Sequence, residues 1–208
     1  MRYTLEYPSE LPTAPDDFLS PPAVIRDVVS RAEAAGFAAV ALSEHPAPSL
    51  KWRRNGGHNT VDPPVAALSF MAGVTSRIKL MTNLFVLPFR NPYLSAKALG
   101  SVDILSGGRL IAGVGAGGVP TLGVLRAGRR GRRPGRVARR STRRTARDLD
   151  RSRNTGQWAG GFTATGPMWL QPPVQRPHPP IWIGGNTAAA ARRVVEHGSG
   201  WMPLIAPS

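Results

Sequence analysis

The sequence contains no cysteine. This absence excludes disulfide bonds, thiolate nucleophiles and metal sites built from thiolates. The four histidines and twelve acidic residues do not stand at spacings typical of metal ligands either. We therefore expect no metal site.

Long hydrophobic runs are also missing. No apolar segment approaches the roughly 20 residues that a membrane-spanning helix requires, and the first residues, MRYTLEYPSELP, lack the apolar region of a signal peptide. We therefore expect a cytoplasmic protein without membrane contact. The 41% of hydrophobic residues in 208 suffice for the core of one domain.

Lysine is scarce, and the positive charge is concentrated in one place. The chain has 3 Lys against 24 Arg, and thirteen arginines lie within residues 126–153, beginning with Arg126 and ending with Arg153. Because Asp148 and Asp150 are its only acids, this segment carries 13 − 2 = +11 of the formal charge of +15. Clustered cations bind phosphates by releasing counterions, so we expect non-specific polyanion binding there.

Strand-like and helix-like segments alternate along residues 1–118. Three helices are expected after Ser20-Pro21, Asp62-Pro63 and Asn91-Pro92, each a polar cap followed by proline at the first helical position. Short apolar runs predict strands at 2–7, 37–42, 78–87 and 109–114. Successive strand-helix units favour a parallel α/β architecture. In the third helix we expect a buried stripe formed by Leu94, Ala98, Val102 and Leu105.

The pattern disappears after Gly118 and returns near residue 162. Residues 119–161 are rich in Arg, Gly and Pro and show no apolar periodicity, so we expect an irregular segment outside the core. A proline-rich connector at 172–180 precedes strands expected at 181–183 and 200–204. The chain thus divides into residues 1–118 with strands one to four, 119–161, and 162–208 with strands five and six.

A glycine-rich stretch, GVGAGGVP, follows the fourth strand. It fits the dinucleotide-binding pattern through Gly113, Gly115 and Gly118. A dinucleotide site also requires a helix directly afterwards and an acid about 20 residues further on, and both are missing here. The stretch is therefore interpreted as a glycine-lined strand exit in a barrel.

Two other places have the chemistry of a site. Gly184, Gly185, Asn186 and Thr187 join a buried strand to a helix, where backbone N–H groups and the helix dipole favour an anion; an ordinary tight turn is equally compatible. Arg192 and Arg193 follow in that helix and are expected to be solvated, with phosphate binding as the alternative. His45 follows the second strand, where barrels place catalytic side chains, and its ordinary pKa near 6.5 suits proton transfer; the alternative is a plain loop residue.

The chain resembles the luciferase-like monooxygenase superfamily, and within it the coenzyme F-420-dependent oxidoreductases. The resemblance covers residues 20–118 and 162–204 through AAGFAAVALSEHPAPSLKW, LFVLPFRNPYLSAKALGSVDILSGGRLIAGVGAG and RPHPPIWIGGNTAAAARRVVEHGSGWMP. It implies a TIM-type (β/α)8 barrel with a deazaflavin, coenzyme F-420, at its C-terminal face. It also implies hydride transfer to or from a small organic substrate, and a family-type homodimer. FMN, as in FMN-dependent monooxygenases, is the alternative cofactor.

The resemblance also assigns roles to individual residues. His45 lies beside the reactive ring and positions or exchanges a proton. The remaining residues are expected to bind the cofactor, at the third-strand exit, the fourth-strand exit and the phosphate turn: Thr82, Asn83, Leu84, Gly115, Gly184, Gly185, Asn186 and Thr187.

Three departures from the family pattern lead to a further expectation. Gly118 stands where sugar-phosphate dehydrogenases of the family carry a catalytic Glu, which argues against that substrate. The fourth helix is replaced by the Arg-rich segment, and a complete barrel needs about 250 residues. GC-rich DNA read in a wrong frame yields Arg, Gly, Pro and Ala, so our hypothesis is two compensating frameshifts followed by early termination. We then expect a truncated, incomplete barrel of about six strands, with deazaflavin affinity that is weak or absent; whether such a chain is active does not follow from the sequence. The competing interpretation is a non-enzymatic barrel fragment with a polycationic, nucleic-acid-binding segment.

Overall fold

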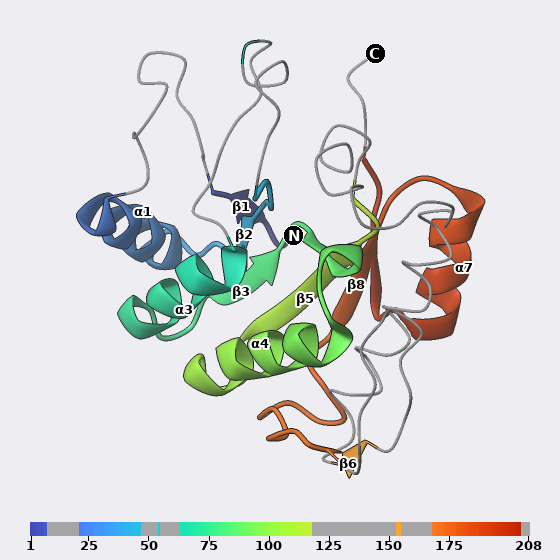
Figure 1. The fold of residues 1–208 in the computed structure, drawn as a ribbon. Helices are drawn as coiled ribbons and strands as arrows, with labels where there is room; N and C mark the ends of the chain where they lie inside the picture. The colour runs from blue at the N-terminus through green and yellow to red at the C-terminus, as the bar shows by residue number, and fades with distance from the viewer. Residues whose placement is uncertain (8–20, 47–53, 55–62, 118–152, 155–167, 205–208) are drawn as a thin grey trace.

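Six parallel strands lie side by side in the order in which the chain forms them (Figure 1). In the computed structural model they are β1 (Thr4–Glu6), β2 (Ala39–Leu42), β3 (Lys79–Thr82), β5 (Leu110–Gly115), β8 (Ile181–Gly184) and β9 (Gly200–Met202). The short β4 (Phe85–Val86) also pairs with β5. The structure describes residues 1–7, 21–46, 54, 63–117, 153–154 and 168–204.

In the described part of the chain, helices connect or follow these strands. They are α1 (Pro22–Ala34), α3 (Pro64–Val74), α4 (Pro92–Leu105) and α7 (Ala188–His197). Figure 1 shows α1, α3 and α4 along one face of the sheet, and α7 packs against β8 and β9. Their apolar sides meet the strands in one core that contains Val29, Leu68 and Leu99 from the helices and Val40 and Leu80 from the strands.

The sequential strand order distinguishes a barrel from a doubly wound fold. A doubly wound sheet reverses its strand order at a switch point, whereas a barrel adds each new strand to the same edge. The described strands follow the second pattern, which also favours the barrel interpretation of the glycine-rich stretch. Among the described residues, β1 and β9 each pair on one side only. The expected fold, an incomplete TIM-type barrel, is confirmed.

Two of the three helices predicted from a polar cap begin one residue later than expected. The cap of α1 is Pro21 and that of α3 is Pro63, because in both places a second proline follows and takes the first helical position. The predicted cap residues Ser20 and Asp62 lie outside the described residues. The third prediction is confirmed, since the Asn91 side chain accepts a hydrogen bond from the Tyr93 amide at 2.8 Å.

The long strand predicted at 78–87 is wrong, because two short strands and a 3-10 helix, η1 (Leu87–Phe89), occupy this stretch. Residues Asn83 and Leu84, joined by a cis peptide bond, lie between β3 and β4. The Asn83 backbone amide still donates to the Leu42 carbonyl of β2 at 2.6 Å, and its side-chain amide donates to Glu6 at 2.9 Å; the Val86 backbone amide instead donates to the Glu44 carboxylate at 2.6 Å. An apolar run alone does not reveal such an interruption.

The predicted buried stripe of α4 is also wrong in part. Leu94 and Leu105 are exposed, whereas Leu99 and Val102 are buried. The buried face includes Asp103, whose carboxylate accepts hydrogen bonds from the backbone and side-chain amides of Gln175 at 3.0 and 2.7 Å. This pair fastens the proline-rich connector to α4 and fixes which side of the helix faces inward.

Most of the Arg-rich segment lies outside the described residues. The described pair Arg153–Asn154 forms β6, antiparallel to β7 (Met168–Trp169). This short antiparallel pairing corrects the expectation that residues 119–161 are irregular, at Arg153 and Asn154. In the part of the chain that the structure describes, no helix has both the length and the hydrophobicity to cross a membrane.

Candidate functional site

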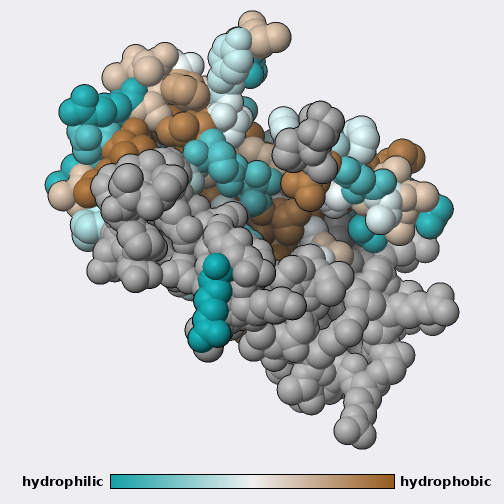
Figure 2. All heavy atoms as spheres, turned by 90° about the horizontal axis from the view of Figure 1, so that it is seen from above, coloured by the Kyte–Doolittle hydropathy of each residue, from teal (hydrophilic) through white to brown (hydrophobic). Residues whose placement is uncertain are grey.

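A cavity of about 650 Å³ opens at the carboxyl ends of the parallel strands, a size usual for small-molecule sites. Figure 2 views the molecule from this end and shows hydrophobic atoms in a hollow between hydrophilic ones. The walls come from the residues at and after β1, β2, β3, β8 and β9, and from α7. They include Glu6, Glu44, His45, Met81, Asn83, Leu84, Val86, Trp182, Gly184, Gly185, Thr187, Arg193, Met202 and Leu204.

The structure brings most of the predicted site residues to this one cavity. His45, Asn83 and Leu84 line it, as do Gly184, Gly185 and Thr187 of the turn between β8 and α7, hereafter the 184–187 turn. Thr82, Gly115 and Asn186 are not among the lining residues. Thr82 is fully buried and donates its hydroxyl hydrogen to the Gly113 carbonyl of β5 at 2.7 Å. Within the described residues no group of three His, Cys, Asp or Glu is arranged to hold a metal.

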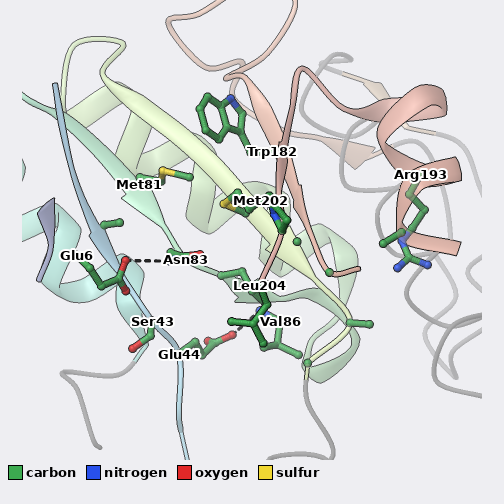
Figure 3. A pocket seen from close by; sticks show the side chains of 18 of the residues that line it. Glu6, Ser43, Glu44, Met81, Asn83, Val86, Trp182, Arg193, Met202 and Leu204 are labelled. Atoms are coloured by element: carbon green, nitrogen blue, oxygen red, sulfur yellow. Dashed lines mark hydrogen bonds between the residues drawn. The ribbon is translucent and has the colours of Figure 1, made fainter. Parts of the chain in front are cut away.

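Two carboxylates at the β1–β3 side of the cavity were missed by the sequence reasoning (Figure 3). Glu6 is solvent-exposed at the end of β1, and partial desolvation by its neighbours raises its pKa above the ordinary value, a shift that the hydrogen bond from the Asn83 side chain opposes in part. Glu44 is 3% exposed and accepts hydrogen bonds from the Val86 amide and the Arg90 guanidinium. We call Glu6 and Glu44 the acidic end of the cavity.

Glu44 holds the cavity wall together beside His45. Its carboxylate joins the end of β2 to β4, and Arg90 in turn lies over the Phe85 ring with its guanidinium carbon 4.3 Å from the ring centroid. The half-buried His45 is the next residue in the chain. An acid directly before a candidate catalytic histidine was the sequence signal that could have identified this residue.

The 184–187 turn joins strand and helix as predicted. Thr187 caps α7, and its hydroxyl accepts a hydrogen bond from the Ala190 amide at 3.1 Å. Gly185 has φ +114°, a conformation that other residues rarely adopt. A Cβ at Gly184 would lie 2.3 Å from Cδ2 of Leu84. Glycine at 185 is therefore favoured by the backbone conformation, and a side chain at 184 would require Leu84 to move, independently of any ligand.

Four hydrogen bonds connect this turn to the residues around the end of β9. The Gly185 amide donates to the Met202 carbonyl at 3.1 Å, and the Trp201 indole donates to the Gly185 carbonyl at 2.9 Å. The Asn186 side chain accepts from the Leu204 amide at 2.8 Å and donates to the Leu204 carbonyl. The Asn186 side chain thus binds the protein's own backbone, which explains its absence from the cavity wall.

Arg193 of α7 provides the cation at the opposite side of the cavity. The expectation that both arginines of this helix are solvated is wrong for Arg193, which is 6% exposed and lines the cavity, and holds for Arg192, which is exposed. Burial, and secondarily the charge of Arg192, lower the pKa of Arg193. Arg193 and the amino-terminal end of α7 are called the basic end of the cavity.

Apolar side chains separate the two ends. Figure 3 shows Met81, Trp182 and Met202 between the acidic end and α7. An apolar middle with one positive end suits a flat aromatic group that carries an anion, because the ring gains from burial and the anion from the helix dipole at the start of α7. The residues present therefore fit a flavin or deazaflavin carrying a phosphate.

Comparison with known sequences gives one family and a group of relatives. The family model described as luciferase-like monooxygenase matches residues 5–208. The F420-dependent glucose-6-phosphate dehydrogenase of Amycolatopsis mediterranei is 38% identical over 99 residues, which cover 44% of this chain and 27% of that protein. The enzyme of the same name from Gordonia bronchialis is 29% identical over 188 residues, 87% of this chain and 52% of that protein. The chain thus spans at most about half the length of these relatives.

Solved structures share the fold. The coenzyme F420-dependent tetrahydromethanopterin reductase of Methanopyrus kandleri has a TM-score of 0.69 at 19% identity, covering 97% of this chain and 55% of that one. The oxygenating constituent of 3,6-diketocamphane monooxygenase from Pseudomonas putida, solved with FMN, has a TM-score of 0.76 at 19% identity, covering 96% and 56%. Both overlaps extend over nearly all of this chain.

Proposed function

The chain belongs to the luciferase-like monooxygenase family, and from this we propose that its cavity binds a deazaflavin, coenzyme F-420, for hydride transfer to or from an organic substrate. FMN is the alternative cofactor, since relatives and neighbours of both kinds carry the same fold. The observation that supports the proposal best is the convergence of His45, the Asn83–Leu84 exit and the 184–187 turn on one cavity.

The chain's own residues have separate tasks in this proposal. When bound, the deazaflavin accepts or gives a hydride. The wall formed by Leu84, Val86 and Trp182 excludes water from the ring, and the 184–187 turn with the start of α7 binds the phosphate. His45, half-buried at the end of β2, positions the substrate or exchanges a proton with it.

Replacement of His45 by alanine tests its task separately from cofactor binding. We expect cofactor affinity to change less than twofold, whereas turnover falls by about 100-fold or more, as for a general acid or base. Reduction or oxidation of the cofactor is followed with a panel of alcohols, aldehydes and unsaturated ketones. Glucose 6-phosphate serves as the negative substrate, because Gly118 stands where a catalytic Glu would be required. An equal loss of affinity and turnover would make His45 a part of the binding site only.

A direct titration tests the proposed cofactor. The 208-residue chain is titrated with coenzyme F-420, FMN and riboflavin, and binding is followed by fluorescence. Because β1 and β9 are open edges among the described strands, we expect F-420 to bind with a Kd between about 1 μM and 1 mM. Riboflavin, which lacks the phosphate, should bind at least about tenfold more weakly than FMN. No saturable binding of either phosphate-bearing cofactor would refute the proposal. Binding at or below about 1 μM with a cooperative thermal melt would refute the frameshift hypothesis.

The concentration of charge in residues 126–153 supports a second activity. We propose that this segment, with its thirteen Arg, binds polyanions without sequence preference. Binding to heparin and to an RNA of random sequence should be equally strong and should fall steeply between 50 and 200 mM salt, by about 10³-fold if six or more contacts form. A preference for one RNA sequence, or binding that salt does not weaken, would contradict this proposal.

A further inference from the structure

Arg193 is an unusual residue for a cavity wall. Its side chain is 94% buried, corresponding to a relative exposure of 6%, and it lines the cavity. Among the described residues, no carboxylate or carbonyl forms a hydrogen bond or ion pair with its guanidinium. A buried charge without a partner is unfavourable, so an anion that enters the cavity and reaches Arg193 gains affinity.

The position of Arg193 along α7 separates it from the phosphate turn. It lies six residues after the cap Thr187, which corresponds to about 9 Å along a helix. Figure 3 shows its side chain on α7, well away from the group formed by Glu44, Val86 and Leu204. The cavity wall therefore passes from His45 and Asn83, through the 184–187 turn, to Arg193. If the ring of a ligand lies beside His45 and Asn83 and its phosphate lies at the 184–187 turn, the group that follows the phosphate points toward Arg193.

This order distinguishes the two candidate cofactors. FMN ends at its phosphate, whereas coenzyme F-420 continues beyond its phosphate into a tail that carries carboxylates. We propose that Arg193 binds an anionic group of this tail and thereby makes the cavity selective for F-420 over FMN. The proposal rests on the proposed function and assigns a specificity-determining residue to it.

Three other features of the structure agree with a tail site rather than a second phosphate site. Gly185 and Thr187 line the cavity at the start of the helix, so the first turn remains available for the phosphate. The acidic end, Glu6 and Glu44, lies at the β1–β3 side and cannot attract an anion. Arg192, next in sequence, is exposed and repels Arg193, which further favours an anion as partner.

The test compares cofactors and variants in the 208-residue chain. Kd is measured by fluorescence for F-420, for FMN and for the phosphate-free deazaflavin core, with wild type, Arg193→Gln, Arg193→Lys and the exposed control Arg192→Gln. We expect Arg193→Gln to weaken F-420 binding by about tenfold, the value of one charge-assisted hydrogen bond. FMN binding should change less than twofold, Arg193→Lys should recover part of the loss, and Arg192→Gln should change neither cofactor.

Contrary outcomes separate this inference from the proposed function. Equal losses for F-420 and FMN would assign Arg193 to the phosphate or to the scaffold, and an unchanged F-420 affinity would refute the inference alone. Failure of the wild type to bind either cofactor would refute both. If thermal melts show that Arg193→Gln does not fold, the salt dependence of the wild type decides: F-420 binding must fall more steeply with salt than FMN binding, and equal slopes overturn the proposal.

Discussion

The two ends of the cavity hold their charges in different ways. At the acidic end, Glu44 is held by a backbone amide and by Arg90, and Glu6 is held by Asn83. At the basic end, Arg193 is buried to a similar degree as Glu44 but has no hydrogen-bond partner among the described residues. A charged side chain whose hydrogen-bond partners belong to the protein stabilises the cavity wall, whereas a charged side chain without such partners can bind a ligand. Under the proposed function, the acidic end is therefore part of the scaffold, and the basic end recognises the anionic groups of the cofactor.

The largest effect on stability is expected at the contact between β3 and β5. This contact joins the strands of the acidic end to the strands of the basic end. A Cβ at Gly113 would lie 1.8 Å from the Thr82 carbonyl oxygen, so Gly113→Ala must push the strands apart. We expect a loss of about 3 kcal/mol or more in the free energy of unfolding, measured by urea denaturation. The control is Gly73→Ala in α3, where a Cβ meets nothing within 4 Å and a gain of about 0.5 kcal/mol is expected. Similar values for the two variants would show that β3 and β5 are not in close contact.

The next effect concerns the acidic end alone. Glu44→Gln keeps the shape of the side chain but removes the anion beside Arg90, so we expect a loss of about 2 kcal/mol in the free energy of unfolding. Asp27→Asn is the matched control, because the Asp27–Arg31 pair is exposed on α1 and contributes less than about 0.5 kcal/mol. Phosphate-dependent selectivity for FMN over riboflavin should be unchanged in Glu44→Gln. A loss of that selectivity would contradict the separation of the two ends.

A smaller effect is expected from the basic end. Asn186→Ala removes both hydrogen bonds to the Leu204 backbone, at an exposed position, and should cost about 1 kcal/mol of stability. Because the 184–187 turn loses its support, we expect FMN and F-420 affinity to fall together by about threefold to tenfold. Trp201→Phe, which removes only the indole hydrogen bond to Gly185, should have a weaker effect on both. Unchanged affinities in Asn186→Ala would show that the turn keeps its shape without this contact.

The smallest effect is a difference in pH dependence between two carboxylates. Backbone amides of residues 76–78 donate to Glu33, and its pKa is lowered to about 2, so its stabilising contribution is present above pH 4.5 and is lost as the pH falls toward 2. The pKa of Glu6 is raised by desolvation, so the folded state holds this proton more tightly; because the side chain is exposed, only a small loss of stability is expected as the pH rises above 4.5. Urea denaturation from pH 2 to 7 gives the free energy of unfolding as a function of pH. In Glu33→Gln we expect its decrease below pH 4.5 to disappear, and in Glu6→Gln its decrease above pH 4.5 to disappear. The same slope in both variants would contradict these assignments.

The sequence predicted the strands and the common location of the site better than the identity of its charged residues. Continuous apolar runs identified β2, β5 and β8, and parallel strands necessarily bring their carboxyl ends to one edge, which placed His45 near Asn83 and Gly185. The Pro21-Pro22 and Pro63-Pro64 pairs were local signals that could have corrected the caps.

The charged residues of the site depend on contacts that local patterns do not contain. The burial of Arg193 depends on the position of α7 against the sheet, and the interruption at Asn83 depends on Glu6 and Glu44, which lie some 77 and 39 positions earlier in the sequence. The exposure of Leu94 depends on Gln175, because the hydrogen bonds of Gln175 to Asp103 select the inward face of α4. Periodicity alone could not reveal any of these contacts.

The double hydrogen bond between Asn186 and Leu204 makes the 184–187 turn responsive to events outside the cavity. Leu204 is exposed and also lines the cavity, so a displacement of its backbone would reach both the turn, through Asn186, and the cavity wall. Under the proposed function, the position of the Leu204 backbone therefore affects how the 184–187 turn is shaped for a phosphate. The affinity for the cofactor then depends in part on an exposed residue at the rim of the cavity.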